Sequence, residues 1–137
     1  MPKVEVTDSK GLVQSAGAGL NISNLTSLVF GSETKTENAD ALSVTIPVSI
    51  LGHDGDEAVS LANGTAVGQT KIIISNTDNT VTCTPATLLG ASTTIATTNI
   101  GEVYVLVWSG AAGWAVVSRS SGASAAAGAI AGAPVLA

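Results

Sequence analysis

Few side chains in this sequence are of the kinds that perform catalysis. The chain of 137 residues has one histidine, His53, and one cysteine, Cys83. A nucleophilic cysteine or serine needs a neighbouring base, and His53 is the only imidazole that could serve. His53 falls in a polar stretch, residues 52–55, that has the composition of a turn, whereas Cys83 falls in the alternating stretch 81–84. We therefore interpret Cys83 as a small buried apolar side chain and expect no catalytic residue.

The densest acidic group, Asp-Gly-Asp-Glu at residues 54–57, is the best candidate for a cation site. Its two aspartates have the spacing of calcium ligands, but the remaining ligands of a calcium loop do not follow. We favour a solvated turn here, and we expect no metal ion, cofactor or small-molecule substrate. We also expect no contact with nucleic acid or with a membrane, because the basic residues are scattered: Lys3, Lys10, Lys35, Lys71 and Arg119.

Trp108 and Trp114 could form a platform on which a sugar ring stacks. Sugar sites usually add carboxylates or amides, and the segment between the two tryptophans has neither. We favour a packing role, with Trp108 in the core and Trp114 closing a hairpin. A glycan-binding function would require Trp114 to be exposed beside polar groups.

The composition indicates that strands would have to position any site. Hydrophobic residues make up 45% of the chain, aromatic residues 3% and charged residues 11%, with a net charge of −5. The core must therefore consist of Ala, Val, Ile and Leu, and the surface is rich in Thr, Ser and Asn, which favours pleated strands over helices. So few charges also suit a surface that neighbouring subunits cover.

Residues 42–51 form the most regular pattern in the sequence. Apolar and polar residues alternate there with period two, which predicts one long strand. Because Pro47 cannot donate to a ladder, we expect an edge strand or a bulged one. Its apolar face consists of Leu42, Val44, Ile46, Val48 and Ile50.

Shorter strands are predicted at 57–61, 69–75, 80–84, 92–96, 102–109 and 114–118. Turn signals separate them, among them Asn63-Gly64 and the hairpin at residues 109–113. Strand 102–109 is apolar on both faces, so we expect it to be central and covered on each side. The spacing of turns, roughly eight to twelve residues, is typical of sandwiches and barrels.

The predicted fold is all-β: a small antiparallel β-sandwich or barrel of the jelly-roll kind. We expect residues 1–41 to be an extended N-terminal arm with short strands, in which 31–40 is a polar loop. The domain proper is expected at 42–119. The uncharged tail 120–137, rich in Ala and Gly, is expected to be flexible and is too poor in large apolar groups to span a membrane.

Part of the sequence resembles virion proteins of tailed bacteriophages. The resemblance is carried by LANGTAVGQTKII (61–73), VTCTPATLLG (81–90), TIA (94–96) and the closing hairpin GEVYVLVWSGAAGWAVV (101–117). It covers about residues 57–118. Similar segments occur in head decoration (cement) proteins, head fibres and tail-associated proteins.

This resemblance implies a non-enzymatic decoration protein that stabilises the capsid. Such a protein would bind the major capsid protein as a homotrimer on the outer surface of the phage head, after synthesis in the host cytoplasm. The main alternative is a receptor- or glycan-binding module of a phage head or tail fibre. A third possibility, a lyase or hydrolase on a β scaffold, would need convergent carboxylates.

Overall fold

The computed structural model describes residues 5–7, 11–13 and 29–120 of the chain. These residues form strands and their connections, and no helix among them is long and apolar enough to cross a membrane. Strands β1 (Glu5–Thr7) and β2 (Gly11–Val13) pair with each other in a small antiparallel sheet. The remaining strands form two larger sheets.

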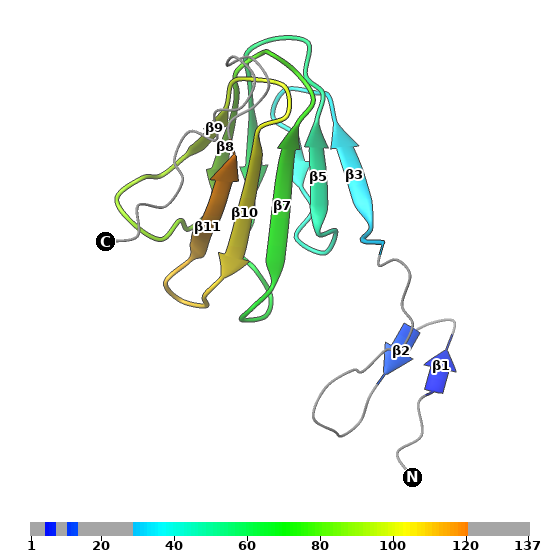
Figure 1. Cartoon of the computed structure of the whole chain (residues 1–137). Coiled ribbons are helices and arrows are strands. Elements are labelled where there is room, and N and C mark those ends of the chain that lie inside the picture. Colours follow the sequence, from blue (N-terminus) through cyan, green and yellow to red (C-terminus); the bar gives the residue numbers. More distant parts are fainter. Residues whose placement is uncertain (1–4, 8–10, 14–28, 121–137) are drawn as a thin grey trace.

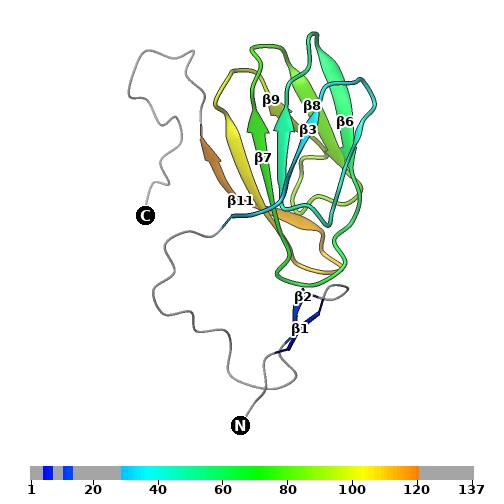
Figure 2. The ribbon, with the colours of Figure 1, turned by 90° about the vertical axis from the view of Figure 1, so that its right-hand side faces the viewer.

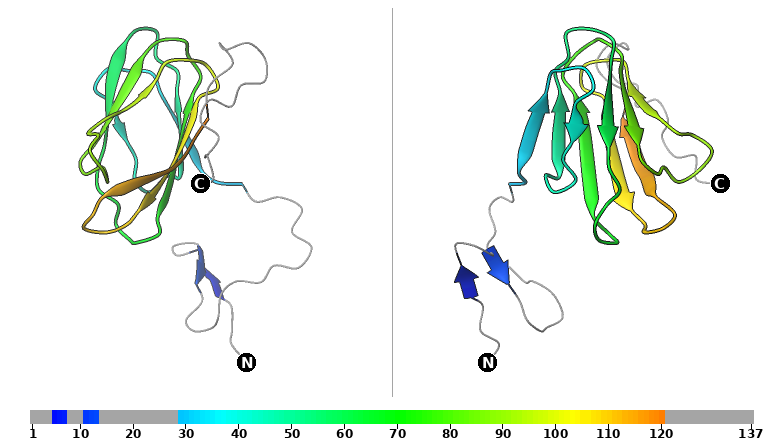
Figure 3. Two further views of the ribbon diagram at one scale, coloured as in Figure 1. Left: turned by 60° about the vertical axis from the view of Figure 1, so that its left-hand side comes forward. Right: turned by 180° about the vertical axis from the view of Figure 1, so that it is seen from behind.

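Two mixed sheets lie face to face (Figure 2, Figure 3). The five-stranded sheet has the order β11-β10-β7-β5-β3, and the four-stranded sheet has the order β4-β6-β8-β9. The first contains β3 (Ser32–Lys35), β5 (Val48–Leu51), β7 (Thr70–Ser75), β10 (Val103–Trp108) and β11 (Trp114–Ser120). The second contains β4 (Ala41–Leu42), β6 (Glu57–Leu61), β8 (Val81–Pro85) and β9 (Ile95–Thr97).

From β3 to β8, successive strands alternate between the sheets. As a result β3, β5 and β7 are parallel neighbours in one sheet, and β4, β6 and β8 are parallel neighbours in the other (Figure 1). Antiparallel pairing joins β8 to β9, β7 to β10 and β10 to β11. The expected antiparallel jelly-roll-like sandwich is therefore wrong: the fold is a coil of parallel strands completed by three antiparallel pairs.

The connections at one end of the coil explain this topology. Residues 36–40, 52–56 and 76–80 arch from the five-stranded sheet to the four-stranded sheet, and each arch is bound to the next. The Glu37 carbonyl lies 3.1 Å from His53 Nε2, and Asp56 accepts from the Thr80 amide at 2.7 Å. Backbone groups in the arches thus find partners in neighbouring arches.

The predicted long strand 42–51 is in fact two strands in different sheets. β4 ends at Leu42, residues 43–47 bend across to the other sheet, and β5 begins at Val48. Leu42 points into the core, but after the bend Ser49 and Leu51 are the buried residues and Val48 points outward. β5 is paired on both sides, so it is not an edge strand, and Pro47 precedes it.

An ion pair in the space between the two sheets, formed by Lys71 of β7 and Glu33 of β3, holds the bend at residues 43–47. The Lys71 ammonium donates to the carbonyls of Ser43 at 2.7 Å and Ile46 at 2.8 Å, and it lies 3.2 Å from Glu33 Oε1. That carboxylate also accepts from the Ser43 amide at 2.8 Å and the Ser49 hydroxyl at 2.5 Å. The Gln69 side chain donates to the Val44 carbonyl as well, so side chains rather than a continuous ladder satisfy the polar groups of the bend.

Other strand predictions are confirmed, with small shifts of their ends: β6, β7, β8, β9, β10 and β11 all lie where strands were expected. The polar loop expected at 31–40 is wrong over β3, which pairs with β5 along its length. The two-sheet unit thus begins ten residues before the expected boundary at residue 42. Most of the predicted arm and nearly all of the predicted tail lie outside the described residues.

Candidate functional site

The two candidate catalytic side chains are both buried. Cys83 on β8 is 1% exposed, and burial raises the pKa of its thiol to about 12, although Lys71 acts in the opposite direction. A thiol with so high a pKa does not form the thiolate that nucleophilic chemistry needs. Cys83 is a core side chain, as predicted.

His53 belongs to the arch at residues 52–56 and is only 2% exposed, which its polar sequence context did not indicate. Its Nε2 atom is 3.1 Å from the Glu37 carbonyl and 3.7 Å from Glu57 Oε2. Its backbone carbonyl accepts from the Asn79 side chain at 3.0 Å. His53 therefore ties three arches together, and no group of three His, Cys, Asp or Glu side chains within the described ranges could hold a metal ion.

The two tryptophans pack against each other in the core. Trp108 is 8% exposed and Trp114 is fully buried, with ring centroids 5.4 Å apart and an interplanar angle of 61°. The Trp114 indole N–H donates to the Ala62 carbonyl at 2.9 Å. A glycan site on Trp114 requires an exposed ring, and the Trp114 ring is buried instead.

The Lys71–Glu33 pair is also a structural element. Burial lowers the pKa of Lys71, and the neighbouring Glu33 carboxylate works against that lowering. Burial by itself would raise the pKa of Glu33, but the hydrogen bonds from Ser49 and Ser43, together with Lys71, outweigh it and leave the pKa below its ordinary value. Each polar atom of the pair has partners inside the protein, so none is directed at a ligand.

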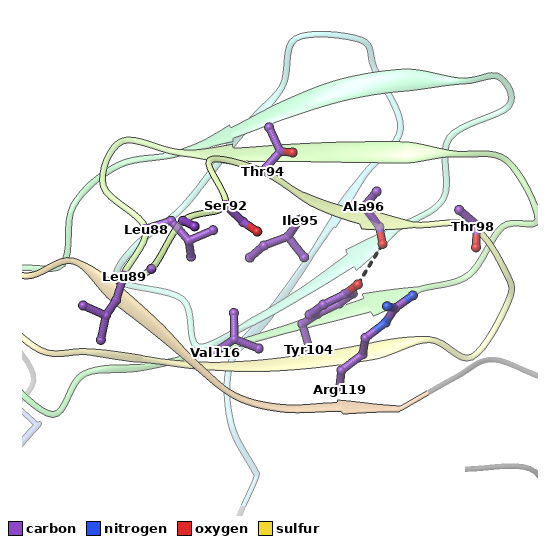
Figure 4. Close-up of a pocket in the computed structure, with 12 residues that line it drawn as sticks. Leu88, Leu89, Ser92, Thr94, Ile95, Ala96, Thr98, Tyr104, Val116 and Arg119 are labelled. Atoms are coloured by element: carbon purple, nitrogen blue, oxygen red, sulfur yellow. Dashed lines mark hydrogen bonds between the residues drawn. The ribbon is translucent and has the colours of Figure 1, made fainter. Parts of the chain in front are cut away.

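A groove lies at the edge of the sheets between β9 and β11 (Figure 4). It has a volume of about 600 Å³ and is lined by apolar and polar side chains in similar measure, with Tyr104 and Arg119 at one end. The Tyr104 hydroxyl donates to the Ala96 carbonyl at 2.9 Å, and Arg119 lies over the Tyr104 ring and 3.4 Å from Glu102. The Tyr104–Ala96 bond links the two sheets, and these contacts engage the polar groups of Tyr104 and Arg119.

The most distinctive surface is the outer face of the five-stranded sheet. Alternate residues of β5, β7 and β10 point outward there, and all are β-branched. The register places them in rows across the sheet, with Ile72 between Val48 and Val105, and Ile74 between Ile50 and Val103. We call this surface the valine–isoleucine face: Val48, Ile50, Ile72, Ile74, Val103, Val105 and Val107.

Small and hydroxyl-bearing residues border this face. Its outward neighbours on β3, β7 and β11 are Ser32, Thr34, Thr70, Ala115, Ser118 and Ser120. The charged residues of these strands turn the other way: Glu33, Lys35 and Lys71 join in ion pairs, and Arg119 lies over Tyr104. Within the described strands, the face therefore bears no charge.

The outer face of the four-stranded sheet is chemically different. Its outward residues are small or hydroxylated: Ala41, Ala58, Ser60, Thr82, Thr84 and Ala96. One sheet thus presents an ordinary solvated face, and the other presents an apolar one. An apolar, uncharged sheet face is typical of a surface that another protein covers.

Sequence reasoning anticipated only part of this surface. The apolar character of both faces of strand 102–109 was recognised, and β10 is paired on both sides as expected. However, its outward face, centred on Val105, meets no other layer of the described chain. In Figure 1 the five-stranded sheet lies in front, with no described strand over it.

In comparisons with known proteins, the sequence matches no protein-family profile, and no curated protein is detectably similar to it.

Proposed function

We propose that this chain is a structural protein of a tailed-phage virion, of the head decoration type. It binds the major capsid protein lattice on the outside of the head as a homotrimer and stabilises it. The observation that carries the proposal is the valine–isoleucine face, because a surface of this kind serves protein–protein contact rather than chemistry. The resemblance of residues 57–118 to virion proteins of tailed phages is the reason for proposing that the other protein belongs to a phage head.

The residues that carry the resemblance have structural roles. Gly64 packs directly against the Trp108 indole, leaving no room for a side chain. Gly113 has a φ of 104° and lies against Thr87. Lys71 holds the bend between β4 and β5. These three residues keep the two-sheet scaffold rigid. A decoration protein needs a rigid scaffold to stabilise a capsid.

The receptor- or glycan-binding alternative is less well supported. It requires an exposed aromatic side chain with polar groups around it, and both tryptophans are in the core. In the groove beside β9, the Tyr104 hydroxyl and the Arg119 guanidinium are paired within the protein. We therefore favour decoration over ligand recognition.

Binding to capsids tests the proposal. Purified protein is mixed with undecorated, expanded capsids of the phage that encodes it and is sedimented with them, with unexpanded procapsids as the control. We expect saturable, stoichiometric binding and a higher temperature of capsid disruption. Absence of binding by folded protein would contradict the decoration function, and a clear glycan-array signal would support the alternative.

A further inference from the structure

We infer that the groove between β9 and β11 is the docking site of this chain's own C-terminal segment, residues 121–137, which adds an extended strand along the outer edge of β11. These residues lie outside the described part of the chain, and their composition by itself predicts a flexible tail. Because the contact lies within one chain, it does not depend on the proposed binding to a capsid.

The groove lies where the two sheets end. In the described part of the chain, β9 is the last strand of the four-stranded sheet and pairs only with β8, and β11 is the last strand of the five-stranded sheet. The outer edge of each strand therefore has backbone N–H and C=O groups outside any ladder. Edges of this kind are where a further extended segment pairs with a sheet.

The edge of β11 already accepts another segment at its first residue. The Trp114 amide donates to the Thr87 carbonyl at 3.0 Å, and the Leu89 amide donates to the Trp114 carbonyl at 2.8 Å. This pairing is a single parallel bridge, and the chain then bends at Gly90, whose φ is 113°. From Ala115 onward, no described segment pairs with the outer edge of β11, and the groove lies beside this stretch.

The lining of the groove favours an uncharged occupant. Ile95 of β9 and Val116 of β11 come from its two sides (Figure 4). Val116 is 44% exposed and Leu89 is 50% exposed, so the described chain leaves apolar surface uncovered there. The charged residue of the lining, Arg119, already lies over the Tyr104 ring. An extended segment with small or apolar side chains therefore fits the groove better than a charged one.

The segment that follows β11 has this composition. Residues 121–137 read SGASAAAGAIAGAPVLA and contain no charged side chain. Gly, Ala and Ser allow a backbone to approach a sheet edge closely, because their side chains need little of the space between the two walls. Placing such a segment in the groove leaves no charge buried without a partner.

The short connection favours this segment over a separate molecule. It starts directly after Ser120, the last residue of β11, and Ser121-Gly122 has the composition of a turn. A chain that reverses there runs antiparallel to β11 from Arg119 to Val116, a distance of about 10 Å at the usual rise of a strand. So short a link gives an effective concentration in about the millimolar range, which a separate molecule rarely reaches.

Proteolysis of the 137-residue chain tests the inference. Elastase cleaves after small residues, so it attacks residues 121–137 when they are undocked, whereas a docked strand resists it. Val116→Glu places a carboxylate in the groove. Val117→Glu is the matched control, because Val117 is 64% exposed and is not part of the groove lining. We expect cleavage of the segment to be at least about tenfold faster in Val116→Glu than in wild type or Val117→Glu, since it follows the undocked population.

Disulfide formation shows which chain fills the groove, and it is the second measurement if Val116→Glu fails to fold. A turn at residues 121 and 122 places the alanines of 125–127 beside Val116, so each is replaced by cysteine in turn and combined with Val116→Cys. Val105→Cys is the control partner, because Val105 pairs with Ser118 of β11 but lies on the outer face of the sheet. The native Cys83 should not interfere, because it is buried and its pKa is raised to about 12.

Mild oxidation should link one of residues 125–127 to position 116 within a single chain and leave position 105 unlinked. Links between two chains would assign the groove to a second copy, and equal linking of positions 116 and 105 would show that the segment has no preferred site. Equal cleavage of wild type and Val116→Glu would likewise overturn the inference. Far-ultraviolet circular dichroism and the fluorescence of the buried tryptophans establish that each variant is folded.

Discussion

Lys71 points from β7 into the space between the sheets, where a charged amine loses its hydration. Three acceptors compensate for that loss: two carbonyls of the bend at 43–47 and the Glu33 carboxylate. Because Glu33 binds Ser43 and Ser49 as well, one ion pair connects β3, β5, β7 and the bend. An internal charge pair thus holds the chain where it passes from one sheet to the other.

Removing one member of this pair should be strongly destabilising. Lys71→Met leaves the Ser43 and Ile46 carbonyls without their donor and removes the buried one of the two cations beside Glu33, whose carboxylate keeps Lys35 at 3.3 Å. Breaking a buried pair in this way costs about 3 kcal/mol. Urea denaturation should show this loss. The double variant Lys71→Met/Glu33→Gln should be more stable than the sum of the single effects predicts, because the Lys71–Glu33 interaction is lost only once. Additive effects would show that the two side chains act independently.

The pair should also make stability depend on acid pH. The pKa of Glu33 in the folded protein lies below its ordinary value of 4.5, so the unfolded chain takes up this proton first as the pH falls. Stability from Glu33 is therefore complete above about pH 4.5 and declines below it, until the folded-state pKa is passed. Urea midpoints measured across this range should fall less steeply for Glu33→Gln than for wild type. An unchanged slope would contradict this assignment.

At the scale of elements, the hairpin at residues 109–113 joins β10 to β11 and also anchors the segment after β8. Gly110 and Gly113 both have positive φ values, as the turn requires. The Trp114 amide donates to the Thr87 carbonyl at 3.0 Å, and the Trp114 carbonyl accepts from Leu89 at 2.8 Å. Position 113 therefore requires glycine for two reasons: the backbone has a positive φ, and Thr87 leaves no room for a side chain.

Gly113→Ala should destabilise the protein for both reasons. An added Cβ would lie 2.8 Å from the Thr87 carbonyl oxygen, and the φ of 104° is unfavourable for any residue with a side chain. Conformational strain of this kind costs about 1–3 kcal/mol, and the steric clash adds to it. Gly55→Ala is the matched control, since nothing lies within 4 Å of its added Cβ. Thermal unfolding should separate the two variants, and equal melting temperatures would refute this view of the turn.

At the scale of the whole molecule, the two sheets have unlike outer faces. One consists of Ala, Ser and Thr, and the other is the valine–isoleucine face. The charged loops are confined to the ends of the coil, away from both faces. An assembly built on such a face depends on burial of apolar surface and hardly at all on electrostatic attraction.

Local sequence was enough to place most strands and one hairpin. β6, β7, β8, β10 and β11 follow from alternation and β-branched content, which act over a few residues. The burial of Cys83 and the packing role of the tryptophans also followed from their neighbours in sequence. Such features depend on the strand's own two faces, so they can be recognised before the fold is known.

The assignment of strands to sheets was decided only by the tertiary structure. Residues 52–56 and 76–80 have the composition of tight turns, yet they arch between sheets, because their polar groups pair with neighbouring arches and not across a hairpin. The alternation of residues 42–51 continues through the bend, so nothing local marks the point where the buried face changes. Lys71 and Glu33, which are distant in sequence, hold the chain at that point. The valine–isoleucine face likewise exists only once β5, β7 and β10 lie side by side, because its residues come from strands that are separated in the sequence.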